Sequence, residues 1–203
     1  MFSNSIKKNK AGRPVTIDKN RITKKCLDFY LLNGIDNQSF NNVIKYAGVS
    51  KGTIYRLYGS EDALQKAVLV EYYNSFIKER LLKFKSKRES LKKIIMDVTS
   101  GLISNRYKVC LYHRSRIEKY KLGKETRSYL SKIETKIEDA YNIITKYQLS
   151  LNNRKYNEAE VSKLVNFLLN GITTLNLLKL NKSSHKVILG YAGTLTKTVN
   201  SFI

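Results

Sequence analysis

Apolar residues recur at intervals of three or four along almost the whole chain, which is the spacing of one face of an α-helix. Between residues 125 and 147, for example, the apolar positions are Tyr129, Ile133, Ile137, Tyr141 and Ile144. No segment shows the sustained alternation of apolar and polar residues that is typical of a strand, and none carries the signature of a hairpin. The pattern therefore predicts an all-α fold of about nine helices.

Glycines and capping residues place the helix boundaries. A first helix is expected from Ile17 to Asn33, ending at Gly34. Ser39 and Ser50 are suited to cap two short helices, residues 40–46 and 51–57. Longer helices are expected from residue 60 to about 84 and over residues 91–103, 110–120, 125–147, 158–180 and 185–202.

The two short helices are separated only by Ala47-Gly48-Val49, in which the glycine readily adopts a positive φ. Two short helices joined by such a turn behind a longer helix have the layout of a helix-turn-helix. In that motif the first short helix braces the second across the major groove of DNA, and the N-terminal residues of the second face the base edges. The layout thus predicts a DNA-binding unit near the N-terminus.

The residues around this turn also carry a family resemblance. The most specific run is Gly48-Val49-Ser50-Lys51-Gly52-Thr53-Ile54-Tyr55, which resembles the N-terminal DNA-binding domain of TetR/AcrR-type transcriptional regulators. The resemblance extends from about Gly12 to Val70, and beyond it only the helix count and Val109-Cys110-Leu111 are similar. It implies a basic arm at 1–15, a helix-turn-helix domain at 16–62 linked through the helix 60–84, and a helical effector-binding and dimerisation domain at 63–203.

The resemblance assigns DNA contacts residue by residue. It implies that the second short helix and its predecessor touch DNA and that an arginine of the arm enters the minor groove. The residues so assigned are Arg13, Ser39, Asn41, Lys45, Lys51, Gly52, Thr53 and Tyr55. Ile54 is expected in the core, and any single lysine is almost as easily explained as solvated surface. Glu61 stands where the family often has a phosphate-binding lysine, so we expect Arg56 or the arm to compensate for repulsion there.

Charge supports a polyanionic partner without choosing it. The 203-residue chain has 38 Lys and Arg against 16 Asp and Glu, a formal net charge of +22. Such an excess points to DNA, RNA or an anionic membrane surface. Residues 1–25 contain eight bases and one acid, although most of the positive charge lies beyond residue 60. No signal peptide and no spanning segment is expected, and two cysteines suit a reducing, cytoplasmic location.

For the second domain the resemblance implies an apolar or aromatic small-molecule effector and a homodimer formed by the last two helices. Candidate ligand-binding residues are Tyr72, Phe76, Tyr107, Cys110, Tyr129, Tyr141 and Phe167, although such spacing is more typical of ordinary core. Glycines within the last two helices indicate a close helix crossing, either between two chains or within one. The residues assigned to a dimer interface are Leu168, Gly171, Ile172, Leu175, Ile188, Tyr191 and Leu195.

Catalytic and metal chemistry find no support in the sequence. Cys110 and His113 are only two potential ligands, whereas structural zinc takes four, so no metal and no cofactor are expected. Cys110 is either an oxidation-sensitive thiol or, more in keeping with the sequence, a buried structural cysteine. The leading hypothesis is a non-enzymatic, homodimeric repressor that reads a palindromic operator in double-stranded DNA and is released by a small molecule. The alternative is a basic all-α nucleic-acid-binding protein, architectural or RNA-binding, without an effector.

Overall fold

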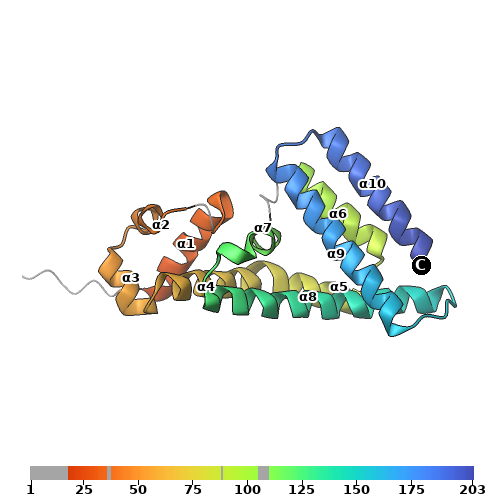
Figure 1. The fold of residues 1–203 in the computed structure, drawn as a ribbon, viewed down its shortest axis with the longest axis horizontal. Coiled ribbons are helices and arrows are strands. Elements are labelled where there is room, and N and C mark those ends of the chain that lie inside the picture. The colour runs from red at the N-terminus through yellow and green to blue at the C-terminus, as the bar shows by residue number, and fades with distance from the viewer. Residues whose placement is uncertain (1–17, 36–37, 88, 105–109) are drawn as a thin grey trace, which may run out of the picture.

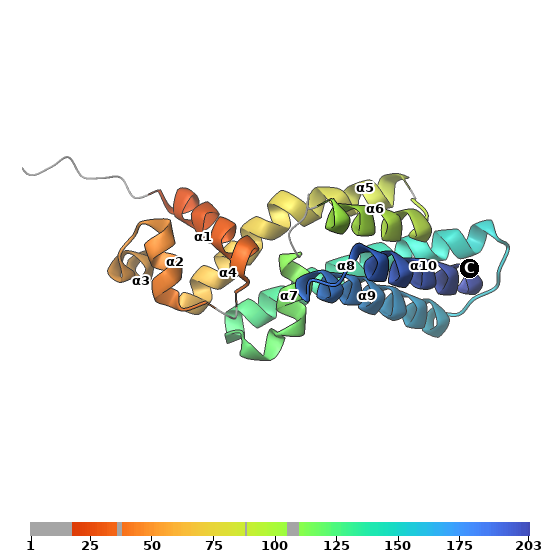
Figure 2. The same ribbon diagram turned by 90° about the horizontal axis from the view of Figure 1, so that it is seen from above.

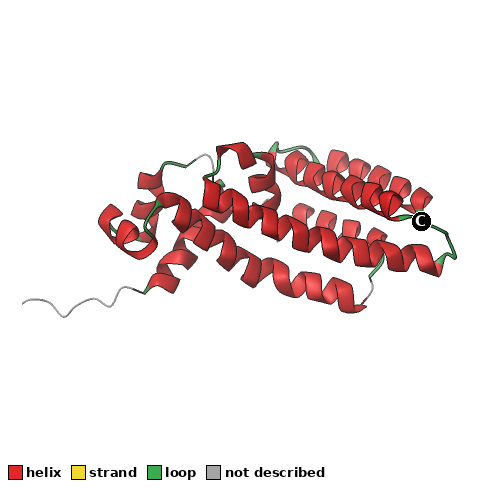
Figure 3. Ribbon diagram, turned by 60° about the horizontal axis from the view of Figure 1, so that its bottom comes forward, coloured by secondary structure: helices red, strands yellow, loops and turns green. Residues whose placement is uncertain are grey.

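The computed structural model describes residues 18–35, 38–87, 89–104 and 110–203, and these ranges are helical with no strand (Figure 3). The all-α prediction is therefore confirmed for the described residues. The first three helices form one end of the molecule, and the remaining helices form the rest (Figure 1). The basic arm and its Arg13 lie outside the described residues.

The N-terminal end consists of α1 (Lys19–Asn33), α2 (Phe40–Ala47) and α3 (Lys51–Tyr58). All three helices are capped at their N-termini by side chains: Asp18 accepts hydrogen bonds at the start of α1, and Ser39 and Ser50 do so for α2 and α3. Both serine caps were predicted, and the helix boundaries differ from the expected ones by one or two residues.

One nearly continuous rod links this end to the rest of the molecule. It comprises α4 (Glu61–Tyr72), a π-helical segment η1 (Tyr73–Ile77) and α5 (Lys78–Lys87). The sequence pattern predicted a single helix here from residue 60 to about 84, and the π segment interrupts it. A π segment adds a residue to the turn and so changes which side chains face inward, and such segments are frequent at functional sites.

The second part of the molecule packs around α8 (Lys124–Leu151), which runs beside the α4–α5 rod (Figures 1 and 3). Helices α6 (Leu91–Ile103), α9 (Glu158–Leu180) and α10 (His185–Phe202) form a layer next to it (Figure 2). Their boundaries are those predicted from the sequence. Helix α7 (Leu111–Ile117) and the 3-10 turn η2 (Lys119–Lys121) lie between this layer and the N-terminal helices (Figure 1).

Gly171 in α9 allows a close crossing with α10 of the same chain. A Cβ at Gly171 would overlap the side chain of Leu195 on α10, so glycine lets the two helices approach. The residues assigned to a dimer interface are accordingly buried in this chain, namely Leu168, Gly171, Ile172, Leu175, Ile188 and Leu195. Residues that are almost wholly buried within one chain offer little surface to a second chain, so the structure speaks against that assignment for these six. Tyr191 is half-buried.

Candidate DNA-binding surface and internal cavity

The turn between α2 and α3 fixes the angle of the helix-turn-helix. Gly48 adopts φ 71° and ψ 38°, the left-handed conformation that glycine reaches without steric cost. Ala47 and Ile54 on either side are buried, which confirms the prediction that Ile54 belongs to the core. Lys25 of α1 donates from Nζ to the Ala47 carbonyl at 3.3 Å, and this contact holds the turn against α1.

Helix α3 is fastened at its C-terminal end by Tyr58. The Tyr58 hydroxyl lies 2.8 Å from Thr23 Oγ1 and donates to the Lys19 carbonyl at 3.1 Å, both on α1. Burial raises the pKa of Tyr58, so its hydroxyl stays protonated and remains a donor. Because its buried side and its last turn are fixed, α3 presents its other side in a defined orientation.

The residues predicted to touch DNA lie mainly on exposed surface of α2 and α3. The exposed ones are Ser39, Asn41, Lys45, Lys51, Gly52, Tyr55 and Arg56, and Thr53 is half-buried. Thr53 lies in the first turn of α3, where its Oγ1 is 2.9 Å from Oγ of the N-cap residue Ser50. The structure thus leaves these side chains accessible, and whether they bind DNA stays a prediction.

An aromatic–cation cluster joins the exposed parts of the two helices. The rings of Phe40 and Tyr55 meet edge to face with centroids 5.9 Å apart. Lys51 Nζ lies 5.7 Å from the Tyr55 centroid and 6.0 Å from that of Phe40. A cation over an aromatic face is attracted to it, so the cluster restrains Lys51 beside the Tyr55 ring.

Glu61 lies close to this cluster at the start of α4. It is half-buried, and Gln65 Nε2 donates to its Oε1 at 3.4 Å. Burial raises the pKa of Glu61, whereas the positive charge of Lys51 acts in the opposite direction. The acid that departs from the family pattern is thus partly balanced by a lysine that is itself assigned to DNA.

Asp62, the next residue, joins the N-terminal helices to α8. Its carboxylate accepts hydrogen bonds from the backbone N–H groups of Glu125 at 2.8 Å and Thr126 at 3.0 Å, and the Thr126 hydroxyl also bonds to it. The N-cap position of α8 is Gly123, which has no side chain, so Asp62 caps α8 from another helix. Burial alone would raise the pKa of Asp62, but these hydrogen bonds outweigh it and lower the pKa.

A second joint connects α7 to α1. Gly34, at the C-terminus of α1, has φ 81°, and a Cβ there would overlap the guanidinium of Arg114. Arg114 therefore lies directly against the end of α1. The sequence offered no signal for this pairing or for the Asp62 cap, because each joins residues far apart in the chain.

A cavity of about 820 Å³, partly open to solvent, lies between the rod and helices α1, α6, α7, α8 and α9. Tyr72, Phe76, Cys110 and Tyr141 line it, as the ligand-binding assignment expected. Tyr129 does not line it, and Phe167 lies on the exposed side of α9 with its ring centroid 6.4 Å from that of Phe202. The assignment is therefore wrong for Tyr129 and Phe167, and Tyr107 lies outside the described residues.

Cys110 is held by neighbours on two helices. Its Sγ lies 2.9 Å from the Tyr72 hydroxyl, and its backbone N–H donates to Asn176 Oδ1 at 3.1 Å. Asn176 Nδ2 in turn donates to the Ile172 carbonyl at 2.9 Å. These contacts tie the rod, the start of α7 and α9 together at the cavity wall.

Sequence comparisons identify no relative of this chain. No protein-family model matches it, and no curated protein matches it either. The described residues contain no group of three or more His, Cys, Asp or Glu side chains placed to hold a metal ion. In the same ranges, no helix has both the length and the apolar character needed to cross a bilayer.

Solved structures are similar over nearly the whole chain. A cysteine mutant of the TetR family regulator CifR, in complex with 26-base-pair operator DNA, has a TM-score of 0.73 at 13% identity, over 91% of this chain and 98% of that one. Reduced NemR from E. coli has a TM-score of 0.69 at 18% identity, over 91% and 96% of the two chains. FadR from Bacillus subtilis, in complex with stearoyl-CoA, has a TM-score of 0.67 at 17% identity, over 92% and 100%.

The chain has the TetR fold. The likeness covers 91% of this chain, so it extends over both the helices α1–α3 and the part that contains the cavity. The sequence resemblance covered only residues 12–70, and the structural likeness extends it to the second part.

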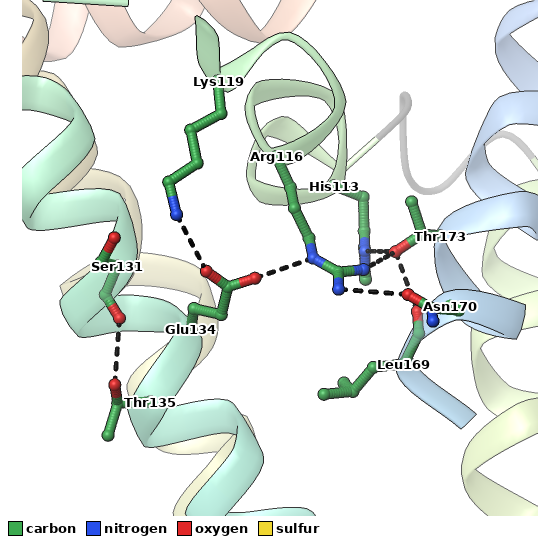
Figure 4. A network of polar contacts seen from close by, with 9 residues as sticks. All are labelled: His113, Arg116, Lys119, Ser131, Glu134, Thr135, Leu169, Asn170 and Thr173. Carbon is green, nitrogen blue, oxygen red and sulfur yellow. Dashed lines mark hydrogen bonds and ion pairs between the residues drawn. The ribbon is translucent and has the colours of Figure 1, made fainter. Parts of the chain in front are cut away.

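One side of the cavity in this TetR fold carries a polar network that the sequence did not predict (Figure 4). His113 Nδ1 on α7 lies 2.9 Å from Thr173 Oγ1 on α9. Arg116 Nη1 donates to the same oxygen at 3.0 Å and its Nε donates to Glu134 on α8 at 2.8 Å. The network thus holds α7 to both α8 and α9, and Lys119 adds an ion pair to Glu134 at 3.2 Å.

Proposed function

We propose that this chain is a sequence-specific, DNA-binding transcriptional repressor that a small molecule in the cavity releases from its operator. The observation that carries the proposal is helix α3. Its buried Ile54 and its fixed ends leave Lys51, Gly52, Tyr55 and Arg56 exposed on one short helix, which is the geometry that base reading in a major groove requires.

The cavity and the DNA-binding end share two structural elements, and this supports control by a ligand. Tyr72 lines the cavity on the same helix whose first turn carries Asp62, the cap of α8. On α7, His113 lines the cavity and its neighbour Arg114 lies against Gly34 of α1. A ligand that shifts either element therefore moves a joint of the DNA-binding end. The ligand lowers DNA affinity only if it binds the arrangement that cannot bind DNA more tightly than the arrangement that can.

A homodimer is part of the proposal, because a palindromic operator presents two half-sites about one helical turn, ~34 Å, apart. The buried residues of α9 and α10 are not available for it. The outward sides of these helices instead expose large apolar side chains, among them Phe167, Leu189 and Phe202. At Gly193 a Cβ would meet nothing within 4 Å, so a second helix has room to approach there. We assign the dimer contact to this surface.

Two substitutions in α3 test the proposal. In a mobility-shift titration against a duplex enriched from a random pool, Tyr55→Ala and Lys51→Ala are expected to weaken binding at least tenfold, with a smaller loss on an unrelated duplex. The matched controls are Tyr156→Ala and Lys163→Ala, which alter exposed residues at the far end of the molecule and should leave binding unchanged. Equal weakening on every duplex would instead support an architectural or RNA-binding protein.

A further inference from the structure

The hydrogen bonds around Thr173 determine which ring nitrogen of His113 carries the proton. Thr173 Oγ1 donates its only proton to the Leu169 carbonyl at 2.8 Å. It therefore acts as an acceptor toward its other two neighbours, and Arg116 Nη1 is a donor by its nature. His113 Nδ1, 2.9 Å from the same oxygen, must then be the protonated nitrogen (Figure 4).

The imidazole is also neutral. Burial lowers the pKa of His113 to about 3, and the positive charges of Arg116 and Arg80 lower it further. A neutral imidazole with its proton on Nδ1 has an unprotonated Nε2, which can accept a hydrogen bond but cannot donate one. His113 lines the cavity, and within the described part of the chain no hydrogen bond reaches its Nε2.

Several polar groups around this part of the wall already bond to their neighbours. Tyr72 hydroxyl and Cys110 Sγ are paired, and the Oδ1 and Nδ2 atoms of Asn176 bond to the backbone. Apolar side chains surround them, including Leu102, Ile137 and Ile172. Of the charged residues that also line the cavity, Asp28, Glu79, Lys83 and Asp97 are exposed and Arg80 is half-buried. An occupant of the inner part therefore meets a mostly apolar wall that presents His113 Nε2 as an acceptor, together with the hydroxyls of Tyr112 and Tyr141, which no hydrogen bond reaches within the described residues.

We propose that the cavity selects neutral aromatic molecules that carry a hydrogen-bond donor, such as phenols, and that His113 Nε2 is the acceptor that selects them. The inference rests on the proposed function only in treating the cavity as the effector site. An analogue without the donor leaves a buried acceptor unpaired, and this costs enough to weaken binding by about tenfold or more.

A matched series of probes tests the inference by titration calorimetry with the full chain. The probes are 2-naphthol, which has a donor, 2-methoxynaphthalene, which has only an acceptor, and the anion 2-naphthoate. The expected result is that 2-naphthol binds at least tenfold more tightly than both others. Comparable affinities for the first two, a preference for 2-naphthoate, or no binding of 2-naphthol up to its solubility would each overturn the inference.

Two variants test whether His113 causes the preference for 2-naphthol. His113→Phe removes the acceptor but keeps a ring of similar size, and it should reduce the preference for 2-naphthol to within about twofold. Thr173→Val keeps the shape of the side chain but removes the partner of Nδ1–H, so the proton is no longer held on Nδ1 and the preference should fall as well. Thr135→Val is the control, because Thr135 makes the same hydroxyl-to-carbonyl contact on exposed α8. Retention of the full preference in a folded Thr173→Val or His113→Phe protein would contradict the assignment, and if His113→Phe does not fold, Thr173→Val decides.

The tautomer has a readout of its own. Nitrogen NMR of the ligand-free chain should show the His113 imidazole with its proton on Nδ1, and protonated Nε2 would overturn the inference.

Operator binding, measured separately, distinguishes a failure of this inference from a failure of the proposed function. If 2-naphthol binds as expected but never alters operator affinity, control by the ligand fails and the selectivity of the cavity stands. If the probes show no preference while Tyr55→Ala still impairs operator binding, the cavity selectivity fails and the DNA-binding function stands.

Discussion

The Asp62 carboxylate accepts a hydrogen bond from the Thr126 backbone N–H at 3.0 Å, and through it the first turn of α4 caps the first turn of α8. The contact joins the helix that follows α3 to the longest helix of the second part. Gly123 makes it possible, because a Cβ at that position would overlap the Asp62 carboxylate. The joint is thus built from one acid, one glycine and the unpaired N–H groups of a helix start.

Removal of this cap should lower stability. Asp62→Ala leaves the N–H groups of Glu125 and Thr126 without their acceptor, and we expect the free energy of unfolding to fall by about 1–2 kcal/mol, the usual cost of losing an N-cap. Denaturant unfolding measures it, with Asp139→Ala on the exposed side of α8 as the control. An Asp62→Ala protein as stable as that control would mean that the joint contributes nothing.

Glu61 gives a prediction for DNA affinity. Glu61→Lys replaces a half-buried acid beside Lys51 with a base at the edge of the proposed DNA surface. Operator binding should tighten several-fold, and the slope of log affinity against log salt should steepen by roughly one unit for one additional phosphate contact. Glu158→Lys reverses an exposed charge at the start of α9 and serves as the control. Equal effects of the two changes would show that only net charge matters.

Burial of neutral His113 predicts how stability depends on pH. The pKa of His113 in the folded chain is lowered to about 3, whereas an unfolded histidine titrates near ~6.5. Between these values the unfolded state binds a proton that the folded state does not. The free energy of unfolding is therefore at its full value above pH ~6.5 and decreases as the pH falls toward 3. The free energy of unfolding of the parent chain should therefore fall more steeply between pH 6.5 and 4 than that of His113→Gln, by up to ~1.4 kcal/mol per pH unit. Parallel curves would contradict the neutral, buried state.

The sequence predicted the local features of this molecule well and the long-range ones poorly. Helices α6, α9 and α10 have the boundaries that periodicity indicated, because their caps and their apolar faces lie within each segment. The buried face of α3 and the caps Ser39 and Ser50 were likewise readable. The Asp62 cap, the Arg114–Gly34 contact and the His113 network depend on which helices meet, and local patterns of spacing and capping do not show that.

The two errors in the second part have physical causes. Gly171 does mark a close helix crossing, but its partner is Leu195 of the same chain, a possibility that the pattern left open. Aromatic spacing placed Tyr129 and Phe167 in the cavity because periodicity locates a face of a helix without showing what that face meets. The π segment at Tyr73–Ile77 shifts the inward face of the rod in a way that a regular 3.6-residue period does not anticipate.

The exposed apolar surface of α9 and α10 predicts the oligomeric state. Leu189→Glu places a charge on the proposed contact between two chains, and we expect it to shift the chain from dimer to monomer at micromolar concentration in sedimentation experiments. Leu151→Glu changes an equally exposed leucine at the end of α8 and should leave the dimer intact. A parent chain that sediments as a monomer, alone and with operator DNA, would exclude the proposed dimer.

Selection of bound duplexes from a random pool tests the central claim most directly. We expect enrichment of one sequence with two related, inverted half-sites centred about one helical turn, roughly 10 base pairs, apart, and no enrichment of it by Tyr55→Ala. Recovery of unrelated sequences in proportion to their abundance would contradict sequence-specific regulation by this chain.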